Sequence, residues 1–340
     1  MGCPKIIYLV ASREFLKSLK ACLRVEILHL EQIKDLLNDL DLLPEIEAGF
    51  RAYSEGKVVV PPVGEMILER GEVHIKYGHV KGDSFYVIKV ASGFYNNSEL
   101  GLPSGNGLML LFNQHSGLTE CILLDEGYLT DVRTAVAGAI AAKHLAPSVV
   151  RRIGILGAGI QGRMQLLWLK EVLACRDALV CGLDEEELRS YQKDMEAEGF
   201  KIETTLDPSQ LAANCELIVT TTPSKTPLLD AADIKKGTHI TAMGSDTPEK
   251  QELDPEIIQK ADLVIADSIS QCMERGEIFR AIKAGKLEKA RVKELGQLIA
   301  GTTSGRVSQD QITVADLTGV AVQDIKIAEA IYRAHQARKS

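Results

Sequence analysis

The sequence lacks the features that mark several large classes of protein. No apolar run approaches the roughly 20 residues that a membrane-spanning helix needs, and lysine and arginine form no long block. The 39 basic and 47 acidic residues give a formal net charge of −8, whereas nucleic acids and anionic membranes bind clustered positive charge. We therefore expect a soluble, cytoplasmic protein with no nucleic-acid or membrane partner, whose ligand is a small molecule.

Cysteine forms no recognisable pattern either. The 7 cysteines are odd in number, with no C-x-x-C pair and no His/Cys cluster at the spacing of zinc ligands. The sequence therefore predicts reduced thiols and no metal site.

Residues 1–24 are set apart as an amino-terminal extension. They include five basic residues and one acid, Glu14, a bias that organelle-targeting peptides share. The run KIIYLV within them is instead typical of a strand. A strand and helix, or an irregular extension, is the simpler interpretation, and targeting is the alternative.

The next hundred residues predict an α+β arrangement. A segment from residue 25 to 53 alternates briefly and then shows helical spacing, broken near Pro44 and stopped by Gly56. Two β-rich runs follow, and Gly82-Asp83 between them suits a hairpin turn. A chain of 340 residues holds more than one hydrophobic core usually accommodates, so a second domain is expected.

The character of the chain changes at residue 130. An Ala-rich helix, capped by Thr130 or Asp131 and ended by Pro147, links the first part to the second. Beyond it, short apolar strands alternate with helices, which predicts a parallel sheet covered on both faces. The fold class is therefore α/β, with a Rossmann-type domain joined to an α+β domain.

A glycine motif predicts a dinucleotide site in the second part. Gly157, Gly159 and Gly162 have G-x-G-x-x-G spacing directly after an apolar strand and before a helix. The glycines permit a tight turn, a close approach of the backbone to a pyrophosphate, and close helix packing. Asp184 follows the second strand, where an acid favours NAD over NADP, although it could simply cap the next helix.

Six segments together resemble the ornithine cyclodeaminase/μ-crystallin family. They are VIKVASGFYNN, LTDVRTAVAGAIAAKHLA, GILGAGIQGRMQ, IVTTTPSKTPLL, HITAMGSDTPEKQELDP and DLTGVAVQDIKIAEAIYRA. The resemblance implies a homodimer that binds NAD, with NADP as the alternative. It also implies that residues 25–129 with 319–340 form a split substrate-binding and dimerisation domain, and that 130–318 form the NAD(P)-binding Rossmann domain.

The resemblance also implies roles for individual residues. Lys89 and Asp246 would be catalytic. Substrate would contact Arg133, Lys76, Thr318, Gly319 and Val320. Cofactor would contact Gly157, Gly159, Ile160, Gln161, Gly162, Asp184, Thr221, Thr222, Met243 and Gly244.

One departure from the family pattern concerns the substrate. Many members carry an arginine in the loop after the first long helix, as a second carboxylate contact, and this chain has Pro62, Val63, Gly64 and Glu65 there. Lys76 and neighbouring His74 are the candidate replacements, and each could equally be a solvated strand residue.

The resemblance implies an NAD-dependent ornithine cyclodeaminase that converts L-ornithine to L-proline and ammonia by transient hydride transfer. Asp246 would hold the distal amine during ring closure. The alternative is a net redox enzyme, an imino-acid (ketimine) reductase or an amino-acid dehydrogenase. A third reading is a nucleotide-dependent binding protein of μ-crystallin type.

Overall fold

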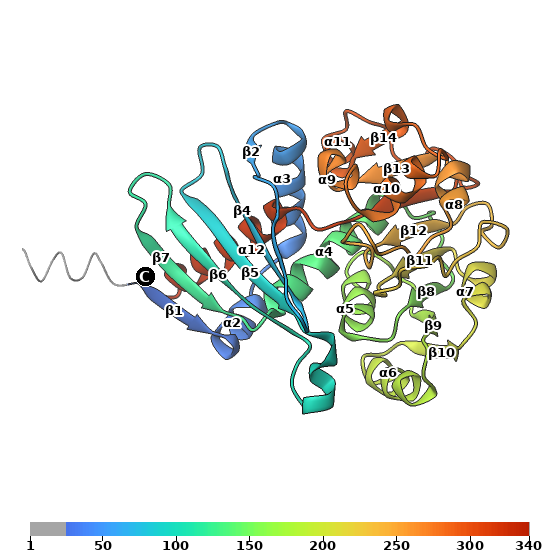
Figure 1. Ribbon diagram of the computed structural model, residues 1–340, viewed down its shortest axis with the longest axis horizontal. Coiled ribbons are helices and arrows are strands. Elements are labelled where there is room, and N and C mark those ends of the chain that lie inside the picture. Colours follow the sequence, from blue (N-terminus) through green and yellow to red (C-terminus); the bar gives the residue numbers. More distant parts are fainter. Residues whose placement is uncertain (1–24, 340) are drawn as a thin grey trace, which may run out of the picture.

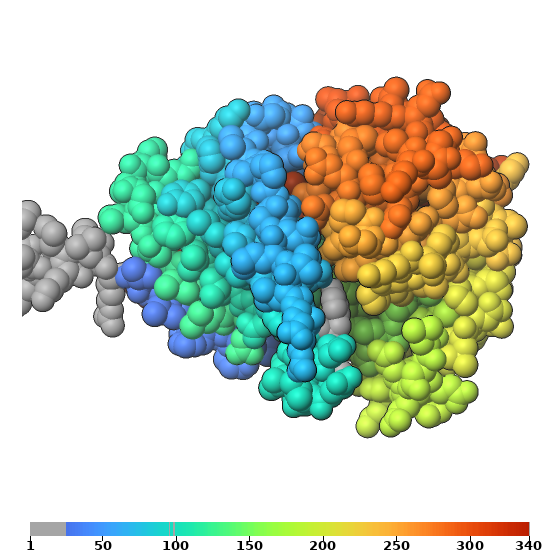
Figure 2. All heavy atoms as spheres, in the orientation of Figure 1, coloured from blue at the N-terminus to red at the C-terminus, as the bar shows by residue number. Residues whose placement is uncertain are grey.

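The computed structural model describes residues 25–339 and builds two sheets (Figure 1). The amino-terminal extension predicted at residues 1–24 lies outside the described residues. The amino-terminal half, blue to cyan, and the carboxyl-terminal half, yellow to orange, meet along a boundary that crosses the face in Figure 2. The predicted fold class is confirmed, because the second sheet is parallel and the first is mixed.

The first sheet has seven strands in the order β1-β7-β6-β5-β4-β2, with β3 also paired to β4. The strands are β1 (Glu26–His29), β2 (Val58–Val59), β3 (Gly64–Ile67), β4 (Glu72–Val80), β5 (Phe85–Gly93), β6 (Gly105–Asn113) and β7 (Thr119–Leu124). All neighbours are antiparallel except β1 and β7. The hairpin predicted at Gly82-Asp83 joins β4 to β5.

Helices cover one face of this sheet. They are α2 (Leu30–Leu37), α3 (Leu42–Ser54) and α12 (Ala321–Ala337), and a 3₁₀ turn, η1 (Tyr95–Leu100), follows β5. Helix α12 packs against α3, β4 and β5, so the last helix of the chain belongs to the core of the first sheet (Figure 1). The helix break expected at Pro44 lies before it instead. Pro44 sits in the first turn of α3, where a missing backbone N–H costs nothing.

Helix α4 (Tyr128–Leu145) runs between the two sheets and packs against α3, α12, α5 and strands of both sheets. It begins two residues earlier than the predicted cap. The reason is Asp125, which precedes the helix. Its buried carboxylate accepts a hydrogen bond from the amide of Leu129 and so caps the first turn, ahead of the Ala-rich run that the prediction used. The helix ends before Pro147, as predicted.

The second sheet is fully parallel, in the order β10-β9-β8-β11-β12-β15-β13-β14. Its strands are β8 (Ile153–Leu156), β9 (Asp177–Cys181), β10 (Lys201–Thr205), β11 (Leu217–Thr220), β12 (His239–Ala242), β13 (Leu263–Ala266), β14 (Val292–Glu294) and β15 (Thr313–Asp316). The connecting helices are α5 (Ile160–Leu169), α6 (Glu185–Ala197), α7 (Pro208–Asn214), α8 (Pro255–Lys260), α9 (Ile269–Cys272), α10 (Gly276–Lys283), η2 (Lys289–Arg291) and α11 (Leu295–Ile299). The strand order reverses direction at β8, between β9 and β11.

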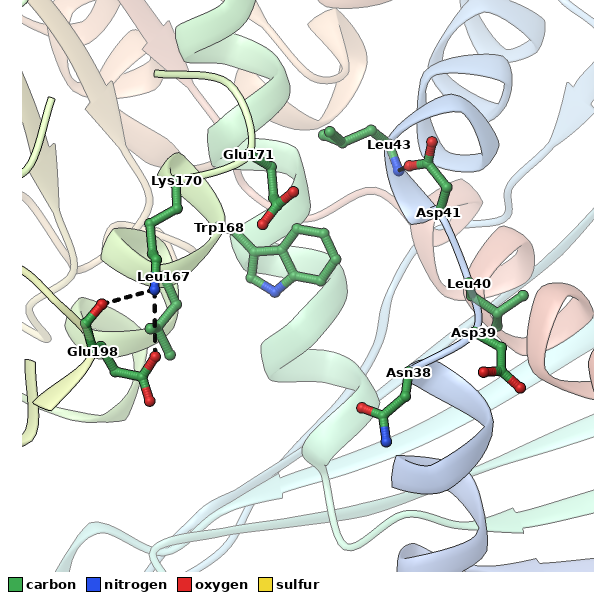
Figure 3. Close-up of a pocket in the computed structure, with 10 residues that line it drawn as sticks. All are labelled: Asn38, Asp39, Leu40, Asp41, Leu43, Leu167, Trp168, Lys170, Glu171 and Glu198. Carbon is green, nitrogen blue, oxygen red and sulfur yellow. Dashed lines mark hydrogen bonds and ion pairs between the residues drawn. The ribbon is translucent and has the colours of Figure 1, made fainter. Parts of the chain in front are cut away.

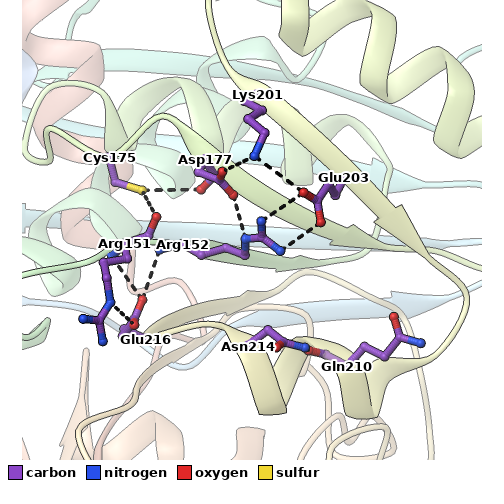
Figure 4. Close-up of polar contacts among 9 residues, drawn as sticks. All are labelled: Arg151, Arg152, Cys175, Asp177, Lys201, Glu203, Gln210, Asn214 and Glu216. Atoms are coloured by element: carbon purple, nitrogen blue, oxygen red, sulfur yellow. Dashed lines mark hydrogen bonds and ion pairs between the residues drawn. The ribbon is translucent and has the colours of Figure 1, made fainter.

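An ion-pair network joins the amino ends of four neighbouring strands (Figure 4). Arg152, just before β8, binds Asp177 of β9 and Glu203 of β10. Glu216, just before β11, accepts hydrogen bonds from the amides of Arg151 and Arg152. The network holds the strands together at their amino-terminal ends. Ligands of open α/β sheets bind at the carboxyl-terminal ends of the strands, on the opposite side.

Within residues 25–339, the five cysteines are unpaired. The same residues contain no group of His, Cys, Asp and Glu side chains suited to a metal ion. No helix among them combines the length and the apolar character needed to cross a bilayer.

Candidate active site

A cavity of about 570 Å³, here called the inter-sheet cavity, lies where the strands of the second sheet end and face the first sheet. Ligands of open α/β sheets collect at this edge, beside the strand where the order reverses. Many of the residues predicted for the site line it. They are Lys76, Arg133, Gly159, Ile160, Gln161, Thr221, Thr222, Met243, Gly244, Asp246, Thr318 and Gly319.

A second hollow of about 570 Å³ lies between the turn joining α2 to α3 and the end of α5 (Figure 3). Its walls carry Asp39, Asp41, Glu171 and the ion pair of Lys170 with Glu198. It contains no glycine loop and none of the residues predicted for the site. The inter-sheet cavity is therefore the candidate active site.

The glycine loop has the geometry of a phosphate cradle. Gly157 has a φ of +112°, and a Cβ there would lie 2.7 Å from Oγ1 of Thr221. A Cβ on Gly162 would lie 2.1 Å from the carbonyl oxygen of Gly157, so α5 can approach β8 only without a side chain. Gly159 begins α5 without any side-chain cap and has open space around its Cβ position. The free amide groups of α5 thus face the cavity, which suits a pyrophosphate.

Glu252 ties together the two loops that border this cradle. Its carboxylate accepts hydrogen bonds from Oγ1 of Thr220 (2.6 Å), from N and Oγ1 of Thr222 (2.6 and 2.8 Å) and from N of Gly244 (2.9 Å). Burial raises the pKa of Glu252, against the effect of these donors. Sequence reasoning missed this residue, because an acid in KQELD is typical of a solvated loop.

Two cations converge on one point of the cavity wall. A Cβ on Gly319 would lie 2.9 Å from Nη1 of Arg133 and 3.1 Å from Nζ of Lys76. Lys76 also donates to the carbonyl oxygens of Gly319 (2.6 Å) and Thr318 (3.3 Å). Burial, together with the charge of Arg133, lowers the pKa of Lys76 to about 8. The pair can bind a carboxylate, and Lys76 can exchange a proton near neutral pH.

Lys89 lies behind this wall. It is the direct cross-strand partner of Lys76, is only 2% exposed, and is not among the residues that line the cavity. Its Nζ is 3.0 Å from Oδ1 of Asp324, and Nε of Arg133 is 2.9 Å from the same oxygen. The catalytic role that the resemblance implied for Lys89 stays a prediction, and the structure places its Nζ against Asp324.

Asp324 balances these buried charges. Burial alone would favour its neutral form, but the charges of Arg133 and Lys89 hold the pKa of Asp324 below its usual value. Burial and the charge of Arg133 lower the pKa of Lys89 to about 7. Asp324 was not predicted. No distinct signal in the sequence marked it, because Lys326 and Glu329 of the same helix are charged as well.

Asp246 follows β12 and lines the cavity, as the resemblance implied. Its Oδ1 is 2.6 Å from Nζ of Lys250, and its side chain is 43% exposed. Although burial acts the other way, the charges of Lys250, Lys76 and His74 keep the pKa of Asp246 below its usual value. The acid is therefore ionised and already has a cationic neighbour. His74 itself lies 3.5 Å from Glu65 and from Glu72, away from the cavity lining.

Two other predicted residues do not reach the cavity wall. Asp184 caps α6, its Oδ1 accepting hydrogen bonds from the amides of Glu186 and Glu187, which is the alternative role that the sequence left open. Val320 is fully buried, and its amide donates to Asp267. Gly157 and Gly162 are also absent from the cavity lining. Gly157 allows the tight turn and Gly162 allows α5 to pack closely on β8.

Comparisons with known proteins agree over nearly the whole chain. The family model "Ornithine cyclodeaminase/mu-crystallin family" matches residues 24–339. An uncharacterized cyclodeaminase of Sinorhizobium fredii is 41% identical over 307 residues, covering 89% of this chain and 93% of that protein.

Two solved structures are also similar. An archaeal alanine dehydrogenase dimer with bound NAD is 31% identical, with a TM-score of 0.85 over 93% of this chain and 97% of that one. The Δ1-pyrroline-2-carboxylate reductase of Thermococcus litoralis, in complex with NADH and L-proline, is 25% identical, with a TM-score of 0.87 over 93% and 98%. With the glycine cradle and the paired cations in place, the match shows that this chain belongs to the ornithine cyclodeaminase/μ-crystallin family.

Proposed function

We propose that the protein is an NAD(H)-dependent oxidoreductase that interconverts an α-imino acid and an α-amino acid. The observation that carries the proposal is the meeting of Arg133 and Lys76 at Gly319, in the same cavity as the glycine cradle. In such a pair, Arg133 can bind an α-carboxylate while Lys76 exchanges a proton with an adjacent group. The nicotinamide-bound alanine dehydrogenase and pyrroline-carboxylate reductase structures support this class of chemistry.

The side chains divide the work between binding and proton transfer. Bound nicotinamide supplies or accepts the hydride. Arg133, held by Asp324, binds the substrate carboxylate and fixes the orientation of Cα. Lys76, with a pKa of about 8, gives a proton to the substrate nitrogen during reduction and takes one during oxidation. Burial of these groups strengthens each interaction, because little water screens them.

We propose NAD rather than NADP as the cofactor. Asp184, Glu185, Glu186 and Glu187 form an acidic run at the start of α6, directly after the second strand of the Rossmann sheet. This run repels a 2′-phosphate even though Asp184 is engaged in capping. Ile160 and Gln161, in the first turn of α5, would border the pyrophosphate.

Ornithine cyclodeaminase is the second candidate, and Asp246 is the observation that favours it. Cyclisation needs a carboxylate to hold the distal amine of ornithine near Cα, and Asp246 lines the cavity. Against it, Asp246 is already 2.6 Å from the ammonium group of Lys250, and Lys76 adds a second positive charge. A further ammonium group there would be repelled, so substrates with one amine fit better.

Cofactor stoichiometry separates the two candidates. In the first assay the α-imino acid is formed from a 2-oxo acid and ammonium. Its reduction should consume one NADH for each amino acid produced. L-Ornithine with catalytic NAD should give no proline. Proline and ammonia without net NADH would establish the cyclodeaminase instead. Tight nucleotide binding with no product from either substrate would indicate a binding protein.

We also propose a homodimer formed through the first sheet. The face of this sheet opposite the helices carries half-buried apolar side chains, among them Ile88, Leu110 and Ile122, and the exposed Tyr77 and Ile27. Residues 25–129 with 319–340 would form this substrate-binding and dimerisation domain, and 130–318 the cofactor domain. Sedimentation velocity checks the assembly state.

A further inference from the structure

The turn at residues 318–320 carries the chain from β15 of the second sheet to α12, which packs on the first sheet. Two carbonyl oxygens of this turn accept hydrogen bonds from Nζ of Lys76, at 2.6 Å for Gly319 and 3.3 Å for Thr318. Gly319 has a φ of +82°, a conformation that favours glycine. Because Lys76 belongs to β4 of the first sheet, the place of its ammonium group depends on how this turn is held.

Asp267 holds the same turn from the second sheet. It follows β13 and is fully buried. Its Oδ2 accepts hydrogen bonds from N of Gly319 (2.7 Å) and N of Val320 (3.2 Å). Its Oδ1 accepts one from Oγ1 of Thr318 (3.2 Å). One carboxylate thus binds three consecutive residues, and the backbone whose amides it fixes is the backbone whose carbonyls bind Lys76.

The hydrogen bonds of Asp267 suit its ionised form. Nε2 of Gln271 donates to Oγ1 of Thr318 (2.9 Å), which leaves the hydroxyl hydrogen of Thr318 for Asp267. All three contacts with the turn are therefore donations to the carboxylate, which favour the anion. Burial raises the pKa of Asp267, whereas the amide of Gly319 and the charge of Lys76 act the other way.

Several other charged groups act on Lys76, and most are engaged elsewhere. The positive ones are Arg133 of α4 and Lys89 of β5, and the negative ones are Asp324 of α12, Asp246 after β12 and Asp267 after β13. Asp324 lies against Lys89 and Arg133, and Asp246 lies against Lys250. Asp267 differs from both, because its hydrogen bonds go to the turn that holds Lys76.

We propose that Asp267 is a positioning residue for Lys76, whose carboxylate locks the 318–320 turn so that Lys76 presents its ammonium group to the substrate nitrogen. Asp267 does not line the inter-sheet cavity, so it acts through the turn and through its charge rather than on the substrate. This inference rests on the proposed function, in which Lys76 transfers the proton.

Two substitutions separate the hold on the turn from the charge. Asp267→Asn keeps an oxygen for the two amides and loses the charge, whereas Asp267→Ala loses both. Asp316→Asn is the matched control, because Asp316 ends β15, is 1% exposed and accepts a hydrogen bond from N of Ile278 in α10 (2.8 Å) instead of from the turn.

The assay is NADH-dependent reduction of the imine formed from pyruvate and ammonium, with kcat/KM divided by the wild-type value at each pH. This ratio cancels the pH dependence of imine formation. Loss of a nearby negative charge should lower the pKa of Lys76 from about 8 by about one unit. For Asp267→Asn the ratio should therefore stay within about threefold of 1 at pH 6 and fall about tenfold by pH 9.

Asp267→Ala should lower kcat/KM about 100-fold even at pH 6, the effect of a misplaced proton donor, without weakening NADH binding. Asp316→Asn should give a ratio that does not change with pH. A purely structural Asp267 would give one factor at every pH. A flat ratio in Asp267→Asn, or the same fall in Asp316→Asn, would overturn the inference.

Propionate binding, measured by calorimetry in the presence of NADH, needs no turnover. The charge of Lys76 beside Arg133 attracts the carboxylate, so wild-type affinity should fall as pH rises through about 8, and the fall should begin about one unit lower in Asp267→Asn. That shift in a protein that reduces no imine would refute the proposed function and keep the positioning role. Imine reduction with no shift in either measurement would do the reverse.

Discussion

Replacing Asp324 with Asn tests the charge arrangement beneath the active site. The carboxylate is 1% exposed and is the shared partner of Lys89 (3.0 Å) and Arg133 (2.9 Å). Removing one member of a buried ion pair costs about 3–5 kcal/mol, because the remaining charge is left uncompensated. Unfolding entropy of about 2.1 cal/mol/K per residue gives roughly 0.7 kcal/mol/K for 340 residues. The expected drop in Tm is therefore about 4–7 °C.

The pH dependence of that loss identifies its cause. Without Asp324, folding favours a neutral Lys89, whereas the unfolded chain keeps its lysine protonated up to a pKa of about 10.4. The pKa of Lys89 is already about 7 in the wild type and should be lower still in Asp324→Asn, so the free energy of unfolding of the variant should begin to rise at a lower pH. The loss relative to wild type should therefore shrink as pH rises from about 5 to 7 and stay constant at higher pH. Differential scanning calorimetry across this range measures the effect.

Asp83→Asn is the matched control. Asp83 is 2.6 Å from Nζ of Lys326, but its side chain is 33% exposed and Lys326 keeps Glu329 as a second partner. A half-exposed pair of this kind contributes about 1 kcal/mol or less. Equal losses of Tm in the two variants, or an unchanged Tm and substrate KM in Asp324→Asn, would refute the role assigned to Asp324.

Three further predictions follow from the site and its sheet. Lys76 must carry its proton to act as the acid, so kcat/KM for imine reduction should fall as pH rises through about 8 and amino-acid oxidation should rise; a flat profile would exclude Lys76. Gly159→Val should keep its Tm, because its Cβ position is open, and lose NADH binding by fluorescence titration; retained affinity would move the cradle elsewhere. Burial lowers the pKa of His239 to about 3, so between pH 6.5 and about 3 this histidine is protonated in the unfolded chain and neutral in the folded protein. The free energy of unfolding of the protein should therefore decrease by up to about 1.4 kcal/mol for each unit by which pH is lowered in this range, and His239→Asn should remove that contribution in acid titrations.

Local sequence patterns predicted most of the fold. Alternating strands and helices after residue 147 indicated the parallel sheet, and the spacing of Gly157, Gly159 and Gly162 indicated its ligand edge. The start of α4 was predicted wrongly, because Asp125 caps it through a bond from outside the helical pattern. Pro44 was misread as a break, since position within the first turn decides whether proline is tolerated.

The chemistry of the site depended on contacts that the sequence does not show. Lys76 and Lys89 are cross-strand partners on one face of the hairpin. The resemblance implied a catalytic role for Lys89 and left Lys76 as a candidate replacement for the absent arginine. Tertiary packing separates them, because Asp324, 235 positions further along the chain, pairs with Lys89. Glu252 was missed for the same reason. It occurs in a polar stretch that predicts a solvated loop, and it is buried by distant segments.

A crystal structure with NADH and a bound α-amino acid would show which residues hold the substrate. We expect the α-carboxylate at Arg133, beside Gly319, with the substrate nitrogen next to Lys76, Cα facing the nicotinamide and Lys89 still bound to Asp324. A carboxylate held elsewhere in the cavity, more than a hydrogen bond away from Arg133, would refute the proposed roles of these residues.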